Sequence, residues 1–323
     1  MKAPQTLQEA IIYFSDFENC KHFVVNTLRW ADGVVKCPRC SSEKVFWIEK
    51  ERVWKCYGKH DHAKFSMKTG TVMEDSAIPV DKWLTALWLI VNCKNGISSC
   101  EMARDLGITQ KSAWFLDHRI RFALYSGSFE KLSGHVEADE TFIGGKARNM
   151  HVAQRQRRIT GTGTKDKTPV MGILERGKDG KSRVRTAVVP NRKKSALQAE
   201  VRKNVEAGSA LYTDFLLSYE GLAGEYAHKV VDHAVEYVRG NVHTNGIENY
   251  WSLLKRTIAG TYVSVEPFHL FRYLDEQAYR FNNRNKEMSD FDRFKLAASQ
   301  MVGKRLTWDQ VTGKNHEGET WPN

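Results

Sequence analysis

The sequence has no apolar run of the 18 or so residues needed to cross a bilayer. The stretch closest to that length, "WLTALWLIV" at 83–91, is typical of a core helix. The N-terminus, "MKAPQTLQEAIIYF", lacks the basic start, the apolar segment and the small-residue cleavage site of a secretory signal. These absences predict a protein without membrane association, located in the cytoplasm.

Cysteines are also few, and acidic residues are fewer than basic ones. Six cysteines in 323 residues do not form a disulfide framework, and paired cysteines in a reducing compartment more often bind metal. The 38 acidic residues are outnumbered by 49 lysines and arginines, which gives a formal net charge of +11. This excess favours a polyanionic partner, with nucleic acid ahead of an anionic membrane surface.

The length and the 41% hydrophobic content allow a sizeable core and predict two or three domains. Residue periodicity divides the chain into five parts. They are a helical segment at 1–30, strand-like pieces broken by cysteine and histidine at 31–76, three short helices at 77–128, a mixed α/β region at 129–290 that starts with antiparallel strands, and a packing tail at 291–323.

The motif "CPRC" at 37–40 is followed by Cys56, His60 and His62. This spacing predicts a tetrahedral zinc ribbon with Cys37, Cys40, Cys56 and a histidine as ligands. We favour His60 because a three-residue gap suits one turn, and His62 is the alternative. Four protein ligands leave no open position for chemistry, so the zinc should be structural. The competing interpretation is that these cysteines are small buried hydrophobes, which is how we interpret Cys20, Cys93 and Cys100.

The stretch "SSCEMARDLGITQKSAWFLDHRIRFAL", residues 98–124, predicts a helix-turn-helix. Gly107 would form the turn and Thr109 would cap the second helix. That helix would enter the major groove of DNA with its N-terminal end. Its predicted DNA contacts are Gln110 and Lys111 at this end, with Arg119 and Arg121 reaching phosphate further along. A helix pair without any role in DNA binding is the alternative.

The strand-like stretch "GHVEADETFIGGK", 134–146, carries three carboxylates among apolar residues. Alternation places Glu137 and Asp139 on one face and Glu140 on the other. Burying such charges is costly unless they are paired or bind a cation. Asp214 ends a second strand, "ALYTDF", where a catalytic carboxylate and a simple turn cap are both reasonable interpretations.

A third stretch, "HTNGIENYWSLLKRTIAG" at 243–260, predicts a helix after an Asn-Gly turn. Glu248, Trp251, Ser252 and Lys255 would share one face of it. An acid, an aromatic ring and a lysine on one stripe suit phosphate chemistry, and an ordinary amphipathic helix is the alternative.

Asp139, Asp214 and Glu248 are separated by 75 and 34 residues, and Lys255 lies seven residues beyond. This pattern resembles the catalytic signature of DDE transposases. More closely, the chain resembles insertion-sequence transposases with an N-terminal transposase zinc ribbon and a ribonuclease H-like catalytic domain. The resemblance covers about residues 20–285 and rests on three blocks, "KFSMKTGTVMEDSAIPVDKWLTALW", "VEADETFIGGK" and "HTNGIENYWSLLKR".

The resemblance implies an α/β protein in which a small zinc ribbon and a helix-turn-helix precede a ribonuclease H-like domain. It implies a DNA transposase that cleaves transposon ends and transfers the 3′-hydroxyl strand into target DNA. Asp139, Asp214 and Glu248 would hold two catalytic Mg²⁺ ions, for which Mn²⁺ can substitute, beside one structural Zn²⁺. Lys255 would contact DNA phosphate. Related groups carry Glu or Asn at the third position, so Asn245 and Asn249 stay open.

The basic, aperiodic stretch 145–168 is expected to be an exposed loop or long hairpin whose Arg155, Arg157 and Arg158 follow the DNA backbone. A solvated basic loop is the alternative. The resemblance further implies double-stranded DNA as partner, both terminal inverted repeats and target, a homodimer or higher assembly, and a nucleoid location on DNA. Two competing functions remain, a non-catalytic zinc-ribbon and helix-turn-helix DNA-binding regulator derived from a transposase, and a nuclease that only hydrolyses.

Overall fold

The computed structural model describes residues 3–125, 130–144, 151–158, 167–177, 181–231 and 242–314. The chain forms two compact units. The first comprises residues 1–126 and 286–320, and the second comprises residues 127–285. No helix within the described ranges combines the length and the hydrophobicity of a membrane span.

The first unit begins with three short helices and a three-stranded sheet. Thr6 caps α1 (Leu7–Ser15) by accepting a hydrogen bond from the backbone N–H of Glu9, and α2 (Phe17–His22) and a π-helical turn (Phe23–Arg29) follow. The strands β1 (Val45–Ile48), β2 (Val53–Cys56) and β3 (Lys64–Phe65) pair antiparallel in that order. Their apolar residues pack with the π-helical turn in one core around the buried side chain of Trp54.

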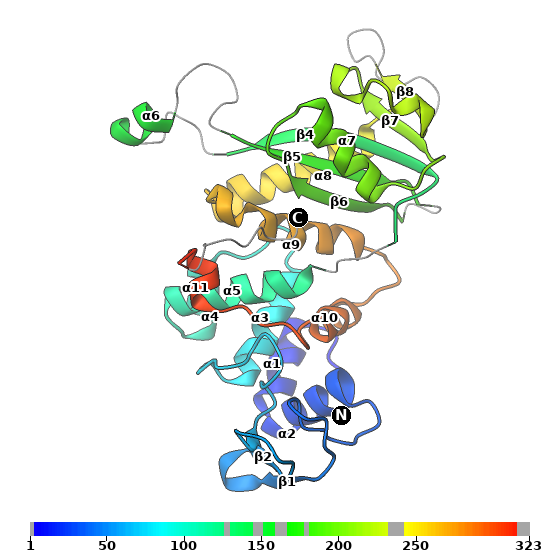
Figure 1. Cartoon of the computed structure of the whole chain (residues 1–323). Helices are drawn as coiled ribbons and strands as arrows, with labels where there is room; N and C mark the ends of the chain where they lie inside the picture. Colours follow the sequence, from blue (N-terminus) through cyan, green and yellow to red (C-terminus); the bar gives the residue numbers. More distant parts are fainter. Residues whose placement is uncertain are drawn as a thin grey trace. The chain divides into compact units, whose positions relative to one another are not determined.

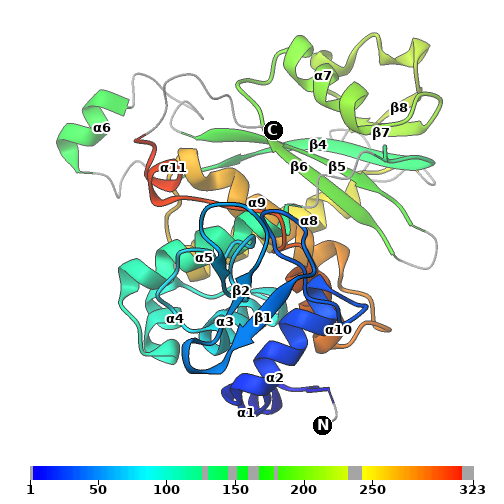
Figure 2. The same cartoon turned by 60° about the horizontal axis from the view of Figure 1, so that its bottom comes forward.

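Three helices follow as predicted, and Figure 2 shows them grouped together. They are α3 (Val80–Asn92), α4 (Ser99–Leu106) and α5 (Gln110–Leu124). Ser98 caps α4 and Thr109 caps α5, while Gly107 ends α4 with a φ of 59°, a left-handed conformation that suits glycine. The local sequence therefore accounts for the turn between α4 and α5.

The last part of the chain contains helices where we expected only a packing tail. These are α10 (Asp290–Ser299) and α11 (Trp308–Thr312), and both belong to the first unit. Phe294 of α10 is fully buried and its ring contacts the rings of Phe14, Phe23 and Trp88. Residues from both ends of the chain thus share one aromatic core.

The second unit is built on a five-stranded mixed sheet of order β6-β5-β4-β7-β8. Its strands are β4 (His135–Ile143), β5 (Thr168–Glu175), β6 (Arg183–Val188), β7 (Ala210–Asp214) and β8 (Ala227–Val231). The first three pair antiparallel, whereas β7 runs parallel to β4 and β8 runs parallel to β7. The mixed sheet confirms the α/β class and is consistent with the ribonuclease H-like fold.

Helices cover both faces of this sheet, as Figures 1 and 2 show. On one face α7 (Lys194–Asn204) packs through Leu197 and Val201 on Val136 and Ala138 of β4. On the other face lie α8 (Asn245–Thr257) and α9 (Leu270–Asn282). The even and odd residues of β4 therefore face two different cores.

One short helix was not predicted. Within the stretch 145–168, which we interpreted as a loop or hairpin, residues Val152–Arg158 form α6. The arginines and glutamines of "VAQRQRR" are good helix formers. The glycines on either side of this segment favoured a loop instead.

Candidate active site

Within the described ranges, two groups of side chains have the composition and spacing of a metal site. The first consists of Cys37, Cys40, Cys56 and His60, with one donor atom of each within 4.8 Å of the others. The Sγ atom of Cys37 lies 3.4 Å from Nε2 of His60, and the Sγ atoms of Cys40 and Cys56 lie 3.6 Å apart. Three sulfurs and one imidazole suit a tetrahedral Zn²⁺.

His60, rather than His62, turns toward the sulfurs. Nε2 of His60 faces Cys37, and its Nδ1 lies 2.6 Å from the carbonyl of Asp61, an arrangement in which Nδ1 donates and Nε2 is free to bind a metal. His62 is exposed and is not in the cluster. Burial raises the pKa of the Cys37 thiol, but hydrogen bonds from the backbone N–H groups of Arg39 and Cys40 and from the side chains of Cys40 and Cys56 together bring that pKa down to about 7. This favours the thiolate that a metal requires.

The second group lies at the ends of β4 and β7 and consists of Asp139, Glu140 and Asp214. Ala138 of β4 pairs with Thr213 of the parallel strand β7, so the next residues, Asp139 and Asp214, become neighbours. One carboxylate oxygen of each of the three residues lies within 4.8 Å of the others. Three carboxylates this close repel one another unless a cation or protons lie between them.

Asp139 is held by the helix that crosses its face of the sheet. Its Oδ2 accepts a hydrogen bond of 2.9 Å from Nε1 of Trp251 on α8. Burial and the charge of Asp214 raise the pKa of Asp139 to about 6, against a contribution from Trp251 that lowers it. The carboxylate is thus oriented by a neutral donor, and no ion pair joins it to a basic side chain in the described part of the chain, an environment that suits a cation ligand.

Glu140 is the member of the cluster that the strand pattern missed. Alternation placed it on the opposite face from Asp139, and its Oε2 does accept a hydrogen bond of 2.7 Å from the hydroxyl of Tyr219 on that side. Burial raises the pKa of Glu140 to about 7, and the Tyr219 hydrogen bond opposes the shift. The adjacent pair Asp139-Glu140 could have indicated that both carboxylates belong to one site, because side chains near the end of a strand can reach around the edge of the sheet.

The structure does not place Glu248 within this cluster of three. It is exposed in the first turn of α8, and its Oε1 accepts a hydrogen bond of 2.8 Å from Oγ1 of Thr244. Its charge nevertheless contributes to the raised pKa of Asp139, so the two carboxylates are within electrostatic range. Lys255 is exposed two turns further along α8.

Trp251 packs in the core and is only 4% exposed. A Cβ atom at Gly172 of β5 would lie 2.5 Å from the indole ring, so the ring rests directly on the β5 backbone. It is therefore not available for stacking on DNA.

The DNA contacts expected from α5 are only partly at the surface. Gln110 and Lys111 are exposed at its N-terminal end. Arg119 and Arg121, however, are 4% and 1% exposed, and Arg119 donates to the carbonyl of Glu74 and lies over the rings of Trp83 and Phe115. This overturns the expectation that they reach phosphate. All residues of α5 from Leu116 to Arg121 are buried, so this part of the helix is enclosed on every side rather than along one face.

Of the three arginines assigned to the basic stretch, Arg155 is exposed on α6. Arg157 and Arg158 also belong to α6, but their side chains lie outside the described part of the structure.

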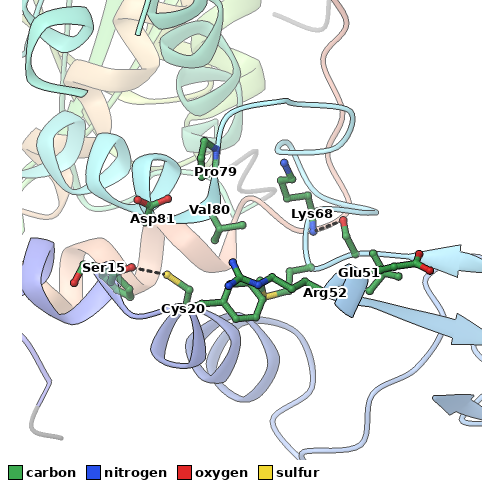
Figure 3. Close-up of a pocket in the computed structure, with 13 residues that line it drawn as sticks. Ser15, Cys20, Glu51, Arg52, Lys68, Pro79, Val80 and Asp81 are labelled. Carbon is green, nitrogen blue, oxygen red and sulfur yellow. Dashed lines mark hydrogen bonds between the residues drawn. The ribbon is translucent and has the colours of Figure 1, made fainter. Parts of the chain in front are cut away.

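A pocket of about 430 Å³ lies within the first unit. Figure 3 shows it bordered by Arg52 and Lys68 from the region of the three-stranded sheet and by Asp81 at the start of α3. The guanidinium of Arg52 lies over the ring of Phe17, and the ammonium of Lys68 donates to the carbonyl of Ile78. These cations are engaged within the fold, and the pocket contains no ligand of either metal cluster.

Comparisons with known proteins agree with both clusters. A family model for an ISXO2-like transposase domain matches residues 131–282, and one for a transposase zinc-ribbon domain matches residues 16–58. An uncharacterized protein in transposable element ISH50 of Halobacterium salinarum is 30% identical over 246 residues, which cover 72% of this chain and 80% of the relative. An uncharacterized transposase-like protein of Haemophilus influenzae is 34% identical over 104 residues, 32% of this chain and 84% of the relative. No solved structure matches the chain significantly.

Proposed function

Since the chain belongs to the family of ISXO2-like transposases of insertion sequences, we propose that its second unit cleaves the ends of a transposon and joins them to target DNA. The observation that carries this proposal is the meeting of Asp139, Glu140 and Asp214 at neighbouring strand ends in a chain with a net charge of +11. A group of three neighbouring carboxylates in a basic protein suits divalent cations between protein and phosphate.

We assign the metal ligands as follows. Asp139 and Asp214 would hold Mg²⁺, or Mn²⁺ in its place, and Glu248 would supply a further carboxylate from α8, with Glu140 as an added candidate. Two bound ions would stabilise the attacking and leaving oxygens of phosphodiester transfer. Trp251 keeps Asp139 in one orientation through its Nε1–H. Lys255, exposed on the same helix, would contact a phosphate near the scissile bond.

The first unit is assigned to DNA recognition. Its Cys₃His cluster would bind one structural Zn²⁺, and the exposed Gln110 and Lys111 would face DNA from the start of α5. Arg155 on α6 of the second unit would contact the backbone. The double-stranded partner would be the terminal inverted repeats and the target, bound by a dimer or larger assembly.

The test uses the purified zinc-loaded protein, a duplex that carries the ends of its own element, and Mg²⁺. Joined products are expected. Asp139→Asn and Asp214→Asn should bind the ends and leave them uncut, while Glu175→Gln, a carboxylate of β5 paired with Arg183, serves as matched control and should react normally. Nicks without joining would indicate a nuclease, and bound, unchanged DNA would indicate a non-catalytic regulator. Cleavage that survives in Asp139→Asn would refute the assignment.

A further inference from the structure

A buried carboxylate of β4 takes no part in the reaction proposed above. Glu137 is 1% exposed and lies two residues before Asp139 on the same face of the strand. Its carboxylate accepts a hydrogen bond of 2.6 Å from Nε of Arg176 and one of 2.8 Å from the backbone N–H of Ile247. The first partner follows β5 and the second lies in the first turn of α8, so one carboxylate joins three elements.

Arg176 continues this connection toward α8. Its Nη2 donates to the carbonyl of His243 at 2.5 Å and to Nδ1 of the same residue at 2.9 Å. Burial and the positive charge of Arg176 lower the pKa of His243, in accord with a neutral ring that accepts through Nδ1. Arg176 therefore holds the segment before α8 through His243, and Glu137 holds the first turn of α8 through Ile247.

Gly246 makes this close approach sterically feasible. A Cβ atom at this position would lie 2.9 Å and 3.0 Å from the two carboxylate oxygens of Glu137. With glycine there, the free N–H groups of the helix start approach the carboxylate directly, where the helix dipole also favours a negative charge.

Glu248 directly follows Ile247, whose backbone N–H donates to Glu137. The Glu248 carboxylate accepts a hydrogen bond from the hydroxyl of Thr244, a residue that is 1% exposed. Three residues further along, Trp251 donates to Asp139, so α8 is attached to β4 at two points one turn apart. The relative positions of Glu248 and Asp139 thus depend on how α8 is fixed to β4.

We propose that Glu137 and Arg176 are positioning residues that fix the start of α8 on β4 and thereby set Glu248 at the distance from Asp139 that a second metal ion requires. This inference rests on the proposed function, because it assumes that Glu248 is a ligand. A buried ion pair is a weak source of stability, since apolar residues of similar size often stabilise a fold as well. Its directional hydrogen bonds, in contrast, fix orientation, and residues that orient metal ligands commonly change metal affinity 10- to 100-fold.

The experiment measures Mn²⁺ binding to the zinc-loaded full chain by titration calorimetry and electron paramagnetic resonance. It compares Glu137→Gln, the neutral pair Glu137→Gln/Arg176→Gln, and the control Glu175→Gln. We expect the weaker Mn²⁺ site to lose about 10-fold or more in affinity in the first two, with the tighter site and the control within about twofold of the wild type. A merely structural pair would weaken both sites together with thermal stability.

Two further outcomes would overturn the inference. One is wild-type affinity at both Mn²⁺ sites in a folded Glu137→Gln protein. The other is a neutral double variant that does not fold, because the pair would then be needed for the fold itself. If Glu137→Gln alone does not fold, the double variant decides, since it buries no unpaired charge.

Asp139→Asn separates this inference from the proposed function. Loss of Mn²⁺ binding in Asp139→Asn with normal binding in Glu137→Gln refutes only the positioning role. Unchanged Mn²⁺ binding in Asp139→Asn refutes the metal site, and the positioning role with it.

Discussion

Asp139→Asn should make the second unit more stable in the absence of Mg²⁺ while it abolishes metal binding. Burial and the charge of Asp214 raise the pKa of Asp139 from 3.8 to about 6 in the folded protein. Between these pH values the folded state binds more protons than the unfolded state, so the free energy of unfolding falls as the pH rises. A shift of about 2 pKa units corresponds to about 3 kcal/mol, fully developed above pH 6 or so.

An asparagine carries no charge and can still accept the hydrogen bond from Trp251. The free energy of unfolding of the variant should therefore exceed that of the wild type by much of these 3 kcal/mol or so at pH 7.5 and by almost nothing at pH 4. The chain has two units, so whole-protein melting would mix their transitions. Native-state hydrogen exchange of peptides from β4 and β7, in Mg²⁺-free buffer and corrected for intrinsic rates, reports on the second unit alone. About 3 kcal/mol corresponds to a change of about 100-fold in the opening constant.

Glu175→Gln is the control, because this carboxylate of β5 is paired with Arg183 and its pKa is lowered by the arginine despite the opposing effect of burial. It should be no more stable than the wild type at pH 7.5. Equal protection of Asp139→Asn and wild type at pH 7.5 would show that Asp139 is not under electrostatic stress, and the argument for a cation at this position would lose its basis.

Three further predictions follow from the same structure. His60→Ala should lose zinc, measured by elemental analysis, whereas His62→Ala should retain about one ion per chain, and the reverse result would reassign the fourth ligand. Gly172→Ala should destabilise the second unit by about 1 to 3 kcal/mol, because a Cβ atom would lie 2.5 Å from the indole ring on α8; unchanged exchange protection of β5 would contradict this packing. Lys111→Ala should weaken DNA binding and reduce the magnitude of its salt dependence by about one charge, while Arg119→Ala, at a position 4% exposed, should chiefly lower the exchange protection of the first unit. If Arg119→Ala weakens DNA binding and leaves this protection unchanged, the arginine contacts DNA after all.

The sequence by itself determined the features that depend on neighbouring residues. Helix caps at Ser98 and Thr109 and the left-handed turn at Gly107 follow from side chains that act within one turn. Strand alternation correctly placed Glu137 and Asp139 on one face of β4, and the spacing of "CPRC", Cys56 and His60 places four donors together. All of these are short-range geometry.

The tertiary structure decided what depends on distant neighbours. The parallel pairing of β4 and β7 makes Asp139 and Asp214 adjacent although 75 residues separate them, and it brings Glu140 into the same cluster. From the sequence Arg119 is expected to be a surface cation. In the fold, however, the ring of Trp83 and the carbonyl of Glu74, both from other segments, enclose it together with the ring of Phe115 on its own helix. Burial and charge pairing are set by residues that meet only after folding, which is why periodicity alone could not assign these roles.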